Sequence, residues 1–307
     1  MFHSSMVPHA GPETRLFEEV VELGALVGRL AEVDAGTVET EAAILWDTES
    51  WWALQADGLP SRAIDYADDV RAAHRALWTA GVSVDFADPE ADLTAYHLVV
   101  VPALYLLSDT AAAALASYVE GGGSLVVSYL SGIADRDHRV RLGGYPGALR
   151  DLLGVRVEEF HPLADGERIG LSTGESGSLW SEHVHAAAGT EVTVRYGDGP
   201  LDGLPAATLR RHGLGTARYL STRLDEPSYQ RLLLDALGRP VPDRPAGLEV
   251  VRRRAQGQSW CFALNHSAVE HRVPTTGLDL VTGSRVEGAV VLAPGGYAVV
   301  REDSGTA

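Results

Sequence analysis

The sequence predicts an α/β protein in which a doubly wound parallel sheet is followed by a small antiparallel β-domain. Three observations support this fold class. Leu98–Val101 and Leu125–Tyr129 are apolar throughout and flank an alanine-rich stretch. Similar apolar runs alternate with helical patterns from residue 42 onward. After residues 238–247 the pattern changes to short alternating runs. Strands that are apolar on both sides belong to a buried parallel sheet. Alternating runs instead indicate antiparallel strands with one face exposed to solvent.

Residues 97–132 form the central strand–helix–strand unit. Ser108 or Asp109 can cap the helix, because their side-chain oxygens accept from its free N–H groups. The glycines Gly121–Gly123 can end it, since glycine enters the left-handed region without a Cβ clash. Two strands joined by a crossover helix run parallel, and the crossover is right-handed.

Further elements follow the same logic on either side of this unit. Upstream, we expect a helix over 12–30, a strand over 42–46, a helix over 65–80 and a strand over 82–86. Downstream, we expect a short helix over 146–153, strands over 192–196 and 217–221 with a turn at 213–216, and a helix over 229–237. The helices show one apolar face at helical spacing.

The segment 238–247, GRPVPDRPAG, contains three prolines and is the clearest linker in the chain. The strands expected beyond it are 248–252, 259–265, 271–274, 277–281, 286–292 and 296–301.

Composition limits the possible functions. The formal net charge is −17, which argues against nucleic acid and anionic membranes as partners, because both require a basic surface. No stretch reaches the roughly 18 apolar residues of a membrane span, and no signal peptide is visible. The single cysteine, Cys261, excludes an internal disulfide. We therefore expect a soluble, cytoplasmic protein.

Nucleotide binding is disfavoured at the place where the fold would put it. The glycine-rich G-x-G-x-x-G motif must lie between the first strand and its helix. Here that position reads Trp46-Asp47-Thr48-Glu49, which has no glycine and carries a carboxylate that would repel a pyrophosphate. We expect no cofactor.

Residues 99–132 also resemble the central region of the amidotransferase-like (flavodoxin-like) fold. Enzymes with that fold use a cysteine at a strand-to-helix elbow, but the elbow after Val101 reads Pro102-Ala103-Leu104. Cys261 lies far along the chain between Trp260 and Phe262, which favours a buried structural thiol over a nucleophile. The fold is therefore expected without the chemistry.

No other constellation stands out. His183 and His185 have the spacing of a strand-borne metal pair, but no third ligand accompanies them, so exposed histidines are the simpler interpretation and no metal is expected. The carboxylates are numerous, yet none forms a pair placed for acid and base catalysis.

Several quoted stretches together resemble the part of a glycoside hydrolase family 42 β-galactosidase that lies downstream of its catalytic barrel. The stretches are FHSSMVPHAGPETRLFEEVVELG, AAILWDTESWWALQ, HLVVVPALYLLSDTAAAALASYVEGGGSLVVSYLSGIAD, YGDGPLDGLPAAT, GLGTARYLSTRLD, WCFALNHSAVEHRV and LAPGGYAVVRE. The resemblance implies an α/β trimerisation domain and a small C-terminal β-domain, and covers nearly the whole chain.

The resemblance also implies where the chemistry is. Both catalytic glutamates and the cysteine-rich metal site of the family belong to the barrel, so no catalytic residue is expected here. The segment 1–11 is similar to the end of the last barrel strand, which in the family reads Glu-Lys-Phe-His. Phe2 and His3 match, and Met1 replaces the lysine. His3 is thus the single substrate-binding residue implied, as a contact to a galactose hydroxyl.

The expected organisation has three parts: residues 1–40 as a barrel remnant with a connecting helix, 41–239 as the trimerisation domain, and 240–307 as linker and C-terminal domain. The chain alone is expected to be inactive, as a fragment, a mis-called start or half of a split gene. Its expected partners are two further copies in a homotrimer, or a barrel-containing chain, with a galactoside bound only in the full-length context.

Two questions remain open from the sequence alone. Trp51 and Trp52 are candidates for an interface or for the core, and both possibilities stand. The alternative to the β-galactosidase hypothesis is a free-standing sugar-binding or amidotransferase-like module without catalytic activity.

Overall fold

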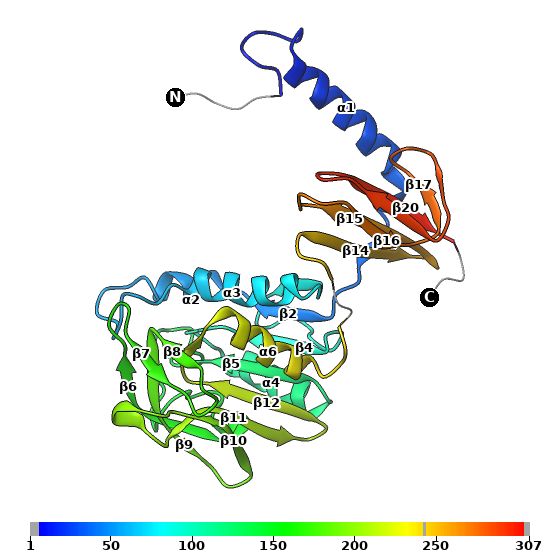
Figure 1. The fold of residues 1–307 in the computed structure, drawn as a ribbon. Helices are drawn as coiled ribbons and strands as arrows, with labels where there is room; N and C mark the ends of the chain where they lie inside the picture. Colours follow the sequence, from blue (N-terminus) through cyan, green and yellow to red (C-terminus); the bar gives the residue numbers. More distant parts are fainter. Residues whose placement is uncertain (1–5, 242–243, 304–307) are drawn as a thin grey trace. The chain divides into compact units, whose positions relative to one another are not determined.

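The computed structural model describes residues 6–241 and 244–303 (Figure 1). The described residues form two compact units. One comprises those of Met1–Glu39 and Arg244–Ala307, and the other those of Thr40–Asp243. The N-terminal segment and the C-terminal β-domain, which the sequence analysis places in separate parts, thus share one unit.

The larger unit is built on a sheet of seven strands. In spatial order these are β10 (Thr190–Arg195), β11 (Pro205–His212), β12 (Gly215–Leu220), β5 (Ser124–Ser128), β4 (Leu98–Val101), β2 (Ala42–Leu45) and β3 (Val84–Ala87). The α/β class predicted from the sequence is confirmed.

Only part of this sheet is parallel. The pairs from β12 through β5, β4 and β2 to β3 are parallel, whereas β10 and β11 are antiparallel extensions. The sequence analysis placed a turn at 213–216 but did not assign residues 205–212 to a strand, so it missed this antiparallel extension. The physical reason is the tight turn at Gly213 and Leu214, which joins β11 directly to β12; a connection this short permits only antiparallel pairing.

Helices cover both faces of this sheet. They are α2 (Thr48–Ala53), α3 (Tyr66–Thr79), α4 (Asp109–Glu120), α5 (Arg150–Leu153) and α6 (Glu226–Leu237), with one 3-10 turn, η2 (Gly199–Leu201). The helix α3 leads from β2 outward to β3, and α4 leads from β4 in the opposite direction to β5. Right-handed crossovers in opposite directions place the two helices on opposite faces. The helix α6 packs beside α3, where the Gln230 side chain donates to the Ala76 carbonyl.

The predicted helix boundaries follow from local capping. The Ser108 hydroxyl accepts from the Ala111 N–H at the start of α4, and Asp65 accepts from Ala67 and Asp68 at the start of α3. Asp225 caps α6 in the same way, by accepting from Ser228. Each cap satisfies backbone donors that the first helical turn leaves free.

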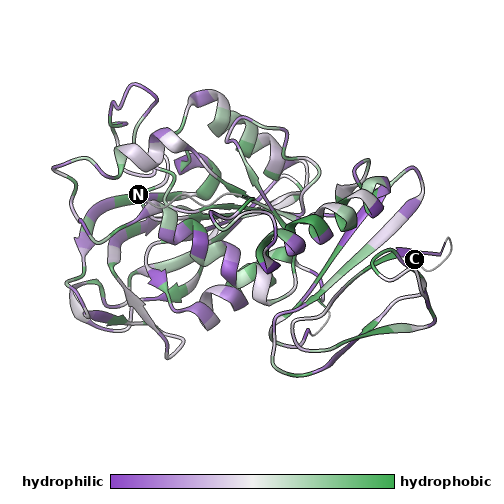
Figure 2. Cartoon of the chain, turned by 90° about the horizontal axis from the view of Figure 1, so that it is seen from above, coloured by the Kyte–Doolittle hydropathy of each residue, from purple (hydrophilic) through white to green (hydrophobic). Residues whose placement is uncertain are grey.

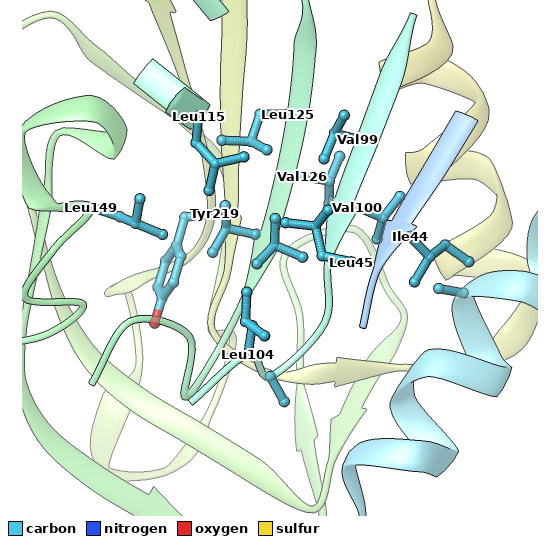
Figure 3. Close-up of a cluster of buried hydrophobic side chains, with 14 of the residues drawn as sticks. Ile44, Leu45, Val99, Val100, Leu104, Leu115, Leu125, Val126, Leu149 and Tyr219 are labelled. Carbon is cyan, nitrogen blue, oxygen red and sulfur yellow. The ribbon is translucent and has the colours of Figure 1, made fainter. Parts of the chain in front are cut away.

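The core of the larger unit lies around β2, β4 and β5. Every residue of β2 and β4 is buried, which explains why their sequences are apolar at each position. Figure 3 shows Leu115 of α4 beside Leu125 of β5, and Ile44, Val99 and Val100 from the neighbouring strands within the same cluster. The hydropathy colouring of Figure 2 is correspondingly hydrophobic along these central strands.

Smaller strands stand beside the main sheet in this unit. They are β6 (Val155–Pro162) paired with β9 (Trp180–Ala186), and β7 (Arg168–Gly170), β8 (Ser176–Ser178) and β13 (Arg223–Leu224) in a three-stranded sheet. These short polar strands had no clear sequence signal.

The smaller unit contains a six-stranded antiparallel sheet and a separate two-stranded sheet. The sheet order is β1 (Thr37–Val38), β14 (Leu248–Ala255), β15 (Gln258–Asn265), β20 (Tyr297–Glu302), β17 (Gly277–Asp279) and β18 (Arg285–Val286). The second sheet pairs β16 (His271–Pro274) with β19 (Ala289–Leu292) in antiparallel fashion. The predicted antiparallel β-domain is therefore confirmed.

The same unit begins with α1 (Arg15–Arg29) and the 3-10 turn η1 (Ala31–Val33). The helix has a strongly amphipathic sequence, yet none of its residues is buried. Leu16, Val21, Leu23 and Val27 are all at least half exposed. Its apolar face is thus unpartnered among the described residues.

Candidate functional site

The carboxyl ends of β2 and β4 are the natural place to look for a site in this fold. The connections from these two neighbouring strands leave in opposite directions, which creates a crevice where ligands of open α/β sheets commonly bind. Two features occupy this edge: the turn Pro102–Leu104 after β4, and α2 with its capping residue Asp47 after β2.

The turn after β4 has the backbone geometry of a nucleophile elbow. Ala103 is completely buried and adopts φ +43°, in the left-handed region that a non-glycine residue rarely enters. A strained residue at a strand-to-helix turn is how such elbows expose a nucleophile. Alanine has no nucleophilic atom, so this position cannot attack a substrate.

The backbone donors of the elbow are also occupied. The Ala103 N–H donates to the Ser128 hydroxyl at 2.8 Å, and the Leu104 N–H donates to the Ser131 hydroxyl at 3.1 Å. Both serines are buried. Acyl-transfer chemistry needs such donors free for an oxyanion, and here they are bonded internally. The elbow therefore serves packing and does not form an oxyanion site.

Cys261 is not placed to supply the missing thiolate. It lies in β15 of the other unit, has no exposed surface, and burial raises the pKa of its thiol to about 11. A thiol held neutral at physiological pH is a poor nucleophile. The prediction of a buried structural thiol is confirmed.

The helix α2 carries the two tryptophans that the sequence left undecided, and they differ. Trp51 is half-buried and packs against the main core, with its ring centroid 5.9 Å from that of Trp46. Trp52 is 62 % exposed. One tryptophan thus belongs to the core, and the next presents a large apolar surface at the switch-point edge.

Polar contacts hold α2 rigidly at this edge. Asp47 accepts from the Ser50 N–H at 2.8 Å and caps the helix. The Ser50 hydroxyl bonds to both the N–H and the carbonyl of Leu106. Arg136 reaches across to Asp47 and Glu49, at 3.5 and 3.0 Å. Trp52 is therefore presented on a fixed support.

Two buried carboxyl groups have strongly shifted pKa values, and neither is placed for catalysis. Burial raises the pKa of Glu182 to about 8, and its oxygens accept from the Trp180 indole at 2.8 Å and the Tyr219 hydroxyl at 2.6 Å. Glu182 has no exposed surface, so no substrate can reach it.

Burial likewise raises the pKa of Asp69 to about 6, against the opposing effects of Arg223 and the Tyr129 hydroxyl. Asp69 lines a cavity of about 30 Å³, which is enough for a water molecule and too small for a sugar. Sequence reasoning missed both carboxyls, because nothing in the local pattern distinguishes a buried acid from an exposed one.

His183 and His185 lie on β9 with their rings stacked, 4.7 Å between centroids. His185 pairs with Glu158 on the neighbouring β6, at 2.5 Å. Within residues 6–241 and 244–303, no group of three or more histidine, cysteine or acidic side chains could hold a metal ion. The pair has the geometry of a surface contact between two strands.

His3, the one substrate-binding residue implied by resemblance, lies outside the described residues. In the part of the chain that is described, no helix combines the length and the apolar character needed to cross a lipid bilayer.

Comparison with known families and proteins agrees with this geometry. Residues 40–240 match the family described as "Beta-galactosidase trimerisation domain", and residues 247–302 match "Beta-galactosidase C-terminal domain". The first match spans the larger unit and the second spans most of the β-domain.

Individual relatives point the same way. A β-galactosidase from Arthrobacter sp. is 48 % identical over 98 % of this chain, and β-galactosidase LacZ from Heyndrickxia coagulans is 38 % identical over 95 %. The crystal structure of a β-galactosidase from Bacillus circulans sp. alkalophilus superposes with a TM-score of 0.90 at 30 % identity, covering 98 % of this chain. The chain spans only 44, 45 and 47 % of the length of these three proteins.

Proposed function

Because this chain belongs to the family of β-galactosidase trimerisation domains, we propose that it is the assembly part of a glycoside hydrolase family 42 β-galactosidase. The observation that carries the proposal is the match of residues 40–240, the whole larger unit, to a domain named for assembly. In this proposal, 307 residues hold copies together and do not by themselves break a glycosidic bond.

The elbow after β4 supports a structural role. An amidotransferase-like enzyme would need a nucleophile at Ala103 and free backbone donors beside it. Alanine supplies no nucleophile, and Ser128 and Ser131 occupy the donors. The buried acids Glu182 and Asp69 are inaccessible to a galactoside, which needs two carboxyl groups on opposite sides of its bond.

The assembly we propose is a homotrimer, or a complex with a barrel-containing chain. Trp52 is our candidate for its contact surface. A large, exposed aromatic side chain on a fixed helix is the type of residue that anchors protein–protein interfaces. Asp47, Ser50 and Arg136 hold that helix in place.

The substrate and the compartment follow from the family and are proposals too. Hydrolysis of terminal β-D-galactosides would be carried out by the portion of the relatives that this chain does not match. His3 would contact a galactose hydroxyl in that context. With a single cysteine and therefore no internal disulfide, the chain suits the cytoplasm.

Two measurements on the purified 307-residue chain test this proposal. Light scattering is expected to give the mass of an oligomer, and a chromogenic β-galactoside is expected to remain uncleaved. A stable monomer over the micromolar range would contradict the homotrimer and leave only assembly with a barrel-containing chain. Clear turnover that survives further purification would show that carboxyl groups of this chain catalyse hydrolysis, and would overturn the proposal.

A further inference from the structure

The larger unit contains a partly open cavity that the assembly role does not explain. Its volume is about 150 Å³. It lies beyond the carboxyl ends of β4 and β5, between the segment 54–64, Tyr105, residues 130–145, and the side strands β6 and β9. This is the edge of a parallel sheet at which ligands commonly bind.

One wall of the cavity is aromatic and fixed. Tyr145 stacks on Phe160, with ring centroids 4.5 Å apart and planes 21° apart. Phe160 in turn contacts Trp180 at 5.0 Å. Trp180 is completely buried and its indole N–H is bonded to Glu182, so this wall cannot easily rearrange. The remaining walls are mainly aliphatic, with Leu54 as an example.

Two phenol groups in this lining have no hydrogen-bond partner among residues 6–241 and 244–303. Other tyrosines of the same unit do: the hydroxyl of Tyr66 donates to the Leu45 carbonyl, and that of Tyr118 to the Tyr96 carbonyl. No protein atom of the described residues accepts from Tyr105 or Tyr145, although both are only partly exposed.

Both tyrosines line this one small cavity. Burial raises the pKa of the Tyr105 hydroxyl, so the group stays neutral and able to donate. The Ser61 hydroxyl, on the opposite segment, accepts from the Ala63 N–H and keeps its own proton free to donate. The cavity thus offers a small number of polar atoms in an otherwise apolar space.

Size and polarity define the ligand class. A cavity of about 150 Å³ accommodates one benzene-sized ring. A hexose fits this site poorly, because each of its hydroxyls would need a partner and the cavity supplies three polar side chains. We propose that this cavity is a binding site for a small phenol, in which the ring packs against Phe160 and the hydroxyl bonds to Tyr105 and Tyr145.

This inference goes beyond the assembly function and does not depend on it, since it concerns binding within one copy. The probes are phenol itself, benzene as the ring without a hydroxyl, and galactose as the sugar. Calorimetric titration of the 307-residue chain is expected to show saturable binding of phenol with a dissociation constant on the order of 10⁻⁴ to 10⁻³ M. Benzene should bind about 3- to 10-fold more weakly, because it forms no hydrogen bond, and galactose should not bind.

A blocking variant locates the site. Val140 lines the cavity and is 47 % exposed, so Val140→Trp can fill the space from the rim without disturbing the buried core. Its matched control is Val291→Trp, a substitution at a residue 49 % exposed in the other unit. We expect V140W to abolish phenol binding and V291W to leave it unchanged. Equal binding by both variants would place the phenol elsewhere and overturn the proposal.

A second variant tests the hydroxyl without altering shape. Tyr105→Phe keeps the ring and removes one polar partner, so phenol should bind about 3- to 10-fold more weakly while benzene affinity stays constant. Three results would overturn the proposal: no saturable binding of phenol, benzene binding as tightly as phenol, or galactose competing with phenol at the same site.

Discussion

At the scale of single residues, Glu182 shows how a buried carboxyl can be accommodated without being functional. The two carboxyl oxygens of Glu182 accept from the Trp180 indole and the Tyr219 hydroxyl. The backbone N–H of Glu182 donates to the Tyr196 hydroxyl. An ionised group in this position would still lack bulk solvation, which is why its pKa rises to about 8. The fold therefore keeps Glu182 protonated at neutral pH.

The sign of the resulting pH dependence follows directly. With a folded-state pKa of about 8 against a reference value of 4.5, the folded state retains a proton that the unfolded chain has released. The free energy of unfolding must then fall as pH rises through this window, by up to about 1.4 kcal/mol per pH unit from this group. Above the folded-state pKa the contribution becomes constant.

We predict that Glu182→Gln removes most of this slope. The glutamine carbonyl can accept from the Trp180 indole, and its amide can donate to the Tyr219 hydroxyl oxygen, so the packing is retained. The measurement is urea unfolding at a series of pH values from about 5 to about 8. Glu191→Gln, at an exposed position of β10, is the control and should keep the wild-type slope. Parallel curves for all three proteins would contradict the shifted pKa.

Ser131 makes a second residue-scale prediction possible. Its buried hydroxyl donates to the Val101 carbonyl at 3.2 Å and accepts from the Leu104 N–H at 3.1 Å. Ser131→Ala removes the bond made by the Leu104 N–H and a bond to the Val101 carbonyl, so we expect a loss of about 1–3 kcal/mol in the free energy of unfolding. Ser117→Ala, on the exposed side of α4, should cost nothing. Equal stability of the two variants would mean that the elbow does not need this serine.

At the scale of elements, the sequence predicts what local rules decide. The strands β2 and β4 are apolar at every position because both of their faces are covered, and this pattern is visible without a structure. The start of α3 at Asp65 and that of α4 at Ser108 are equally local, since each cap bonds within its own first turn.

The elements that escaped prediction depend on distant partners. The strand β1 has two residues and forms only because Thr37 and Val38 pair with Arg254 and Arg253 of β14, more than 200 positions away. The left-handed conformation of Ala103 likewise could not be predicted from the sequence, because alanine does not favour that conformation. Trp51 and Trp52 cannot be told apart in the sequence. Their burial differs because adjacent helical positions face different directions.

The helix α1 has an amphipathic sequence whose apolar face remains uncovered, and this has a measurable consequence. Val21 and Val27 are 56 and 61 % exposed, so the double substitution Val21→Gln, Val27→Gln should change the free energy of unfolding by no more than about 0.5 kcal/mol. Leu292→Ala, in the core of the same unit, should cost about 2–5 kcal/mol. A comparable loss in the double variant would show that the helix face is buried in solution.

At the scale of the whole molecule, charge and assembly must be compatible. The formal net charge of −17 makes copies repel one another at long range, and this repulsion weakens as salt screens it. A stable assembly therefore requires short-range apolar contacts. Within the larger unit, Trp52 and Leu214 are both large and exposed, at 62 and 86 %.

These two residues provide a matched test because they lie at opposite ends of the parallel strands. Trp52 follows the carboxyl end of β2, whereas Leu214 precedes β12 at its amino end. We predict that Trp52→Glu weakens self-association at least about tenfold, since a buried aromatic anchor is lost and a carboxylate must be desolvated in its place. Leu214→Glu adds the same charge away from the proposed interface and should assemble like the wild type. Sedimentation velocity over a range of concentrations measures both effects. If the two variants weaken assembly equally, net charge and not Trp52 governs association; if only Leu214→Glu does so, the interface lies at the opposite edge of the sheet.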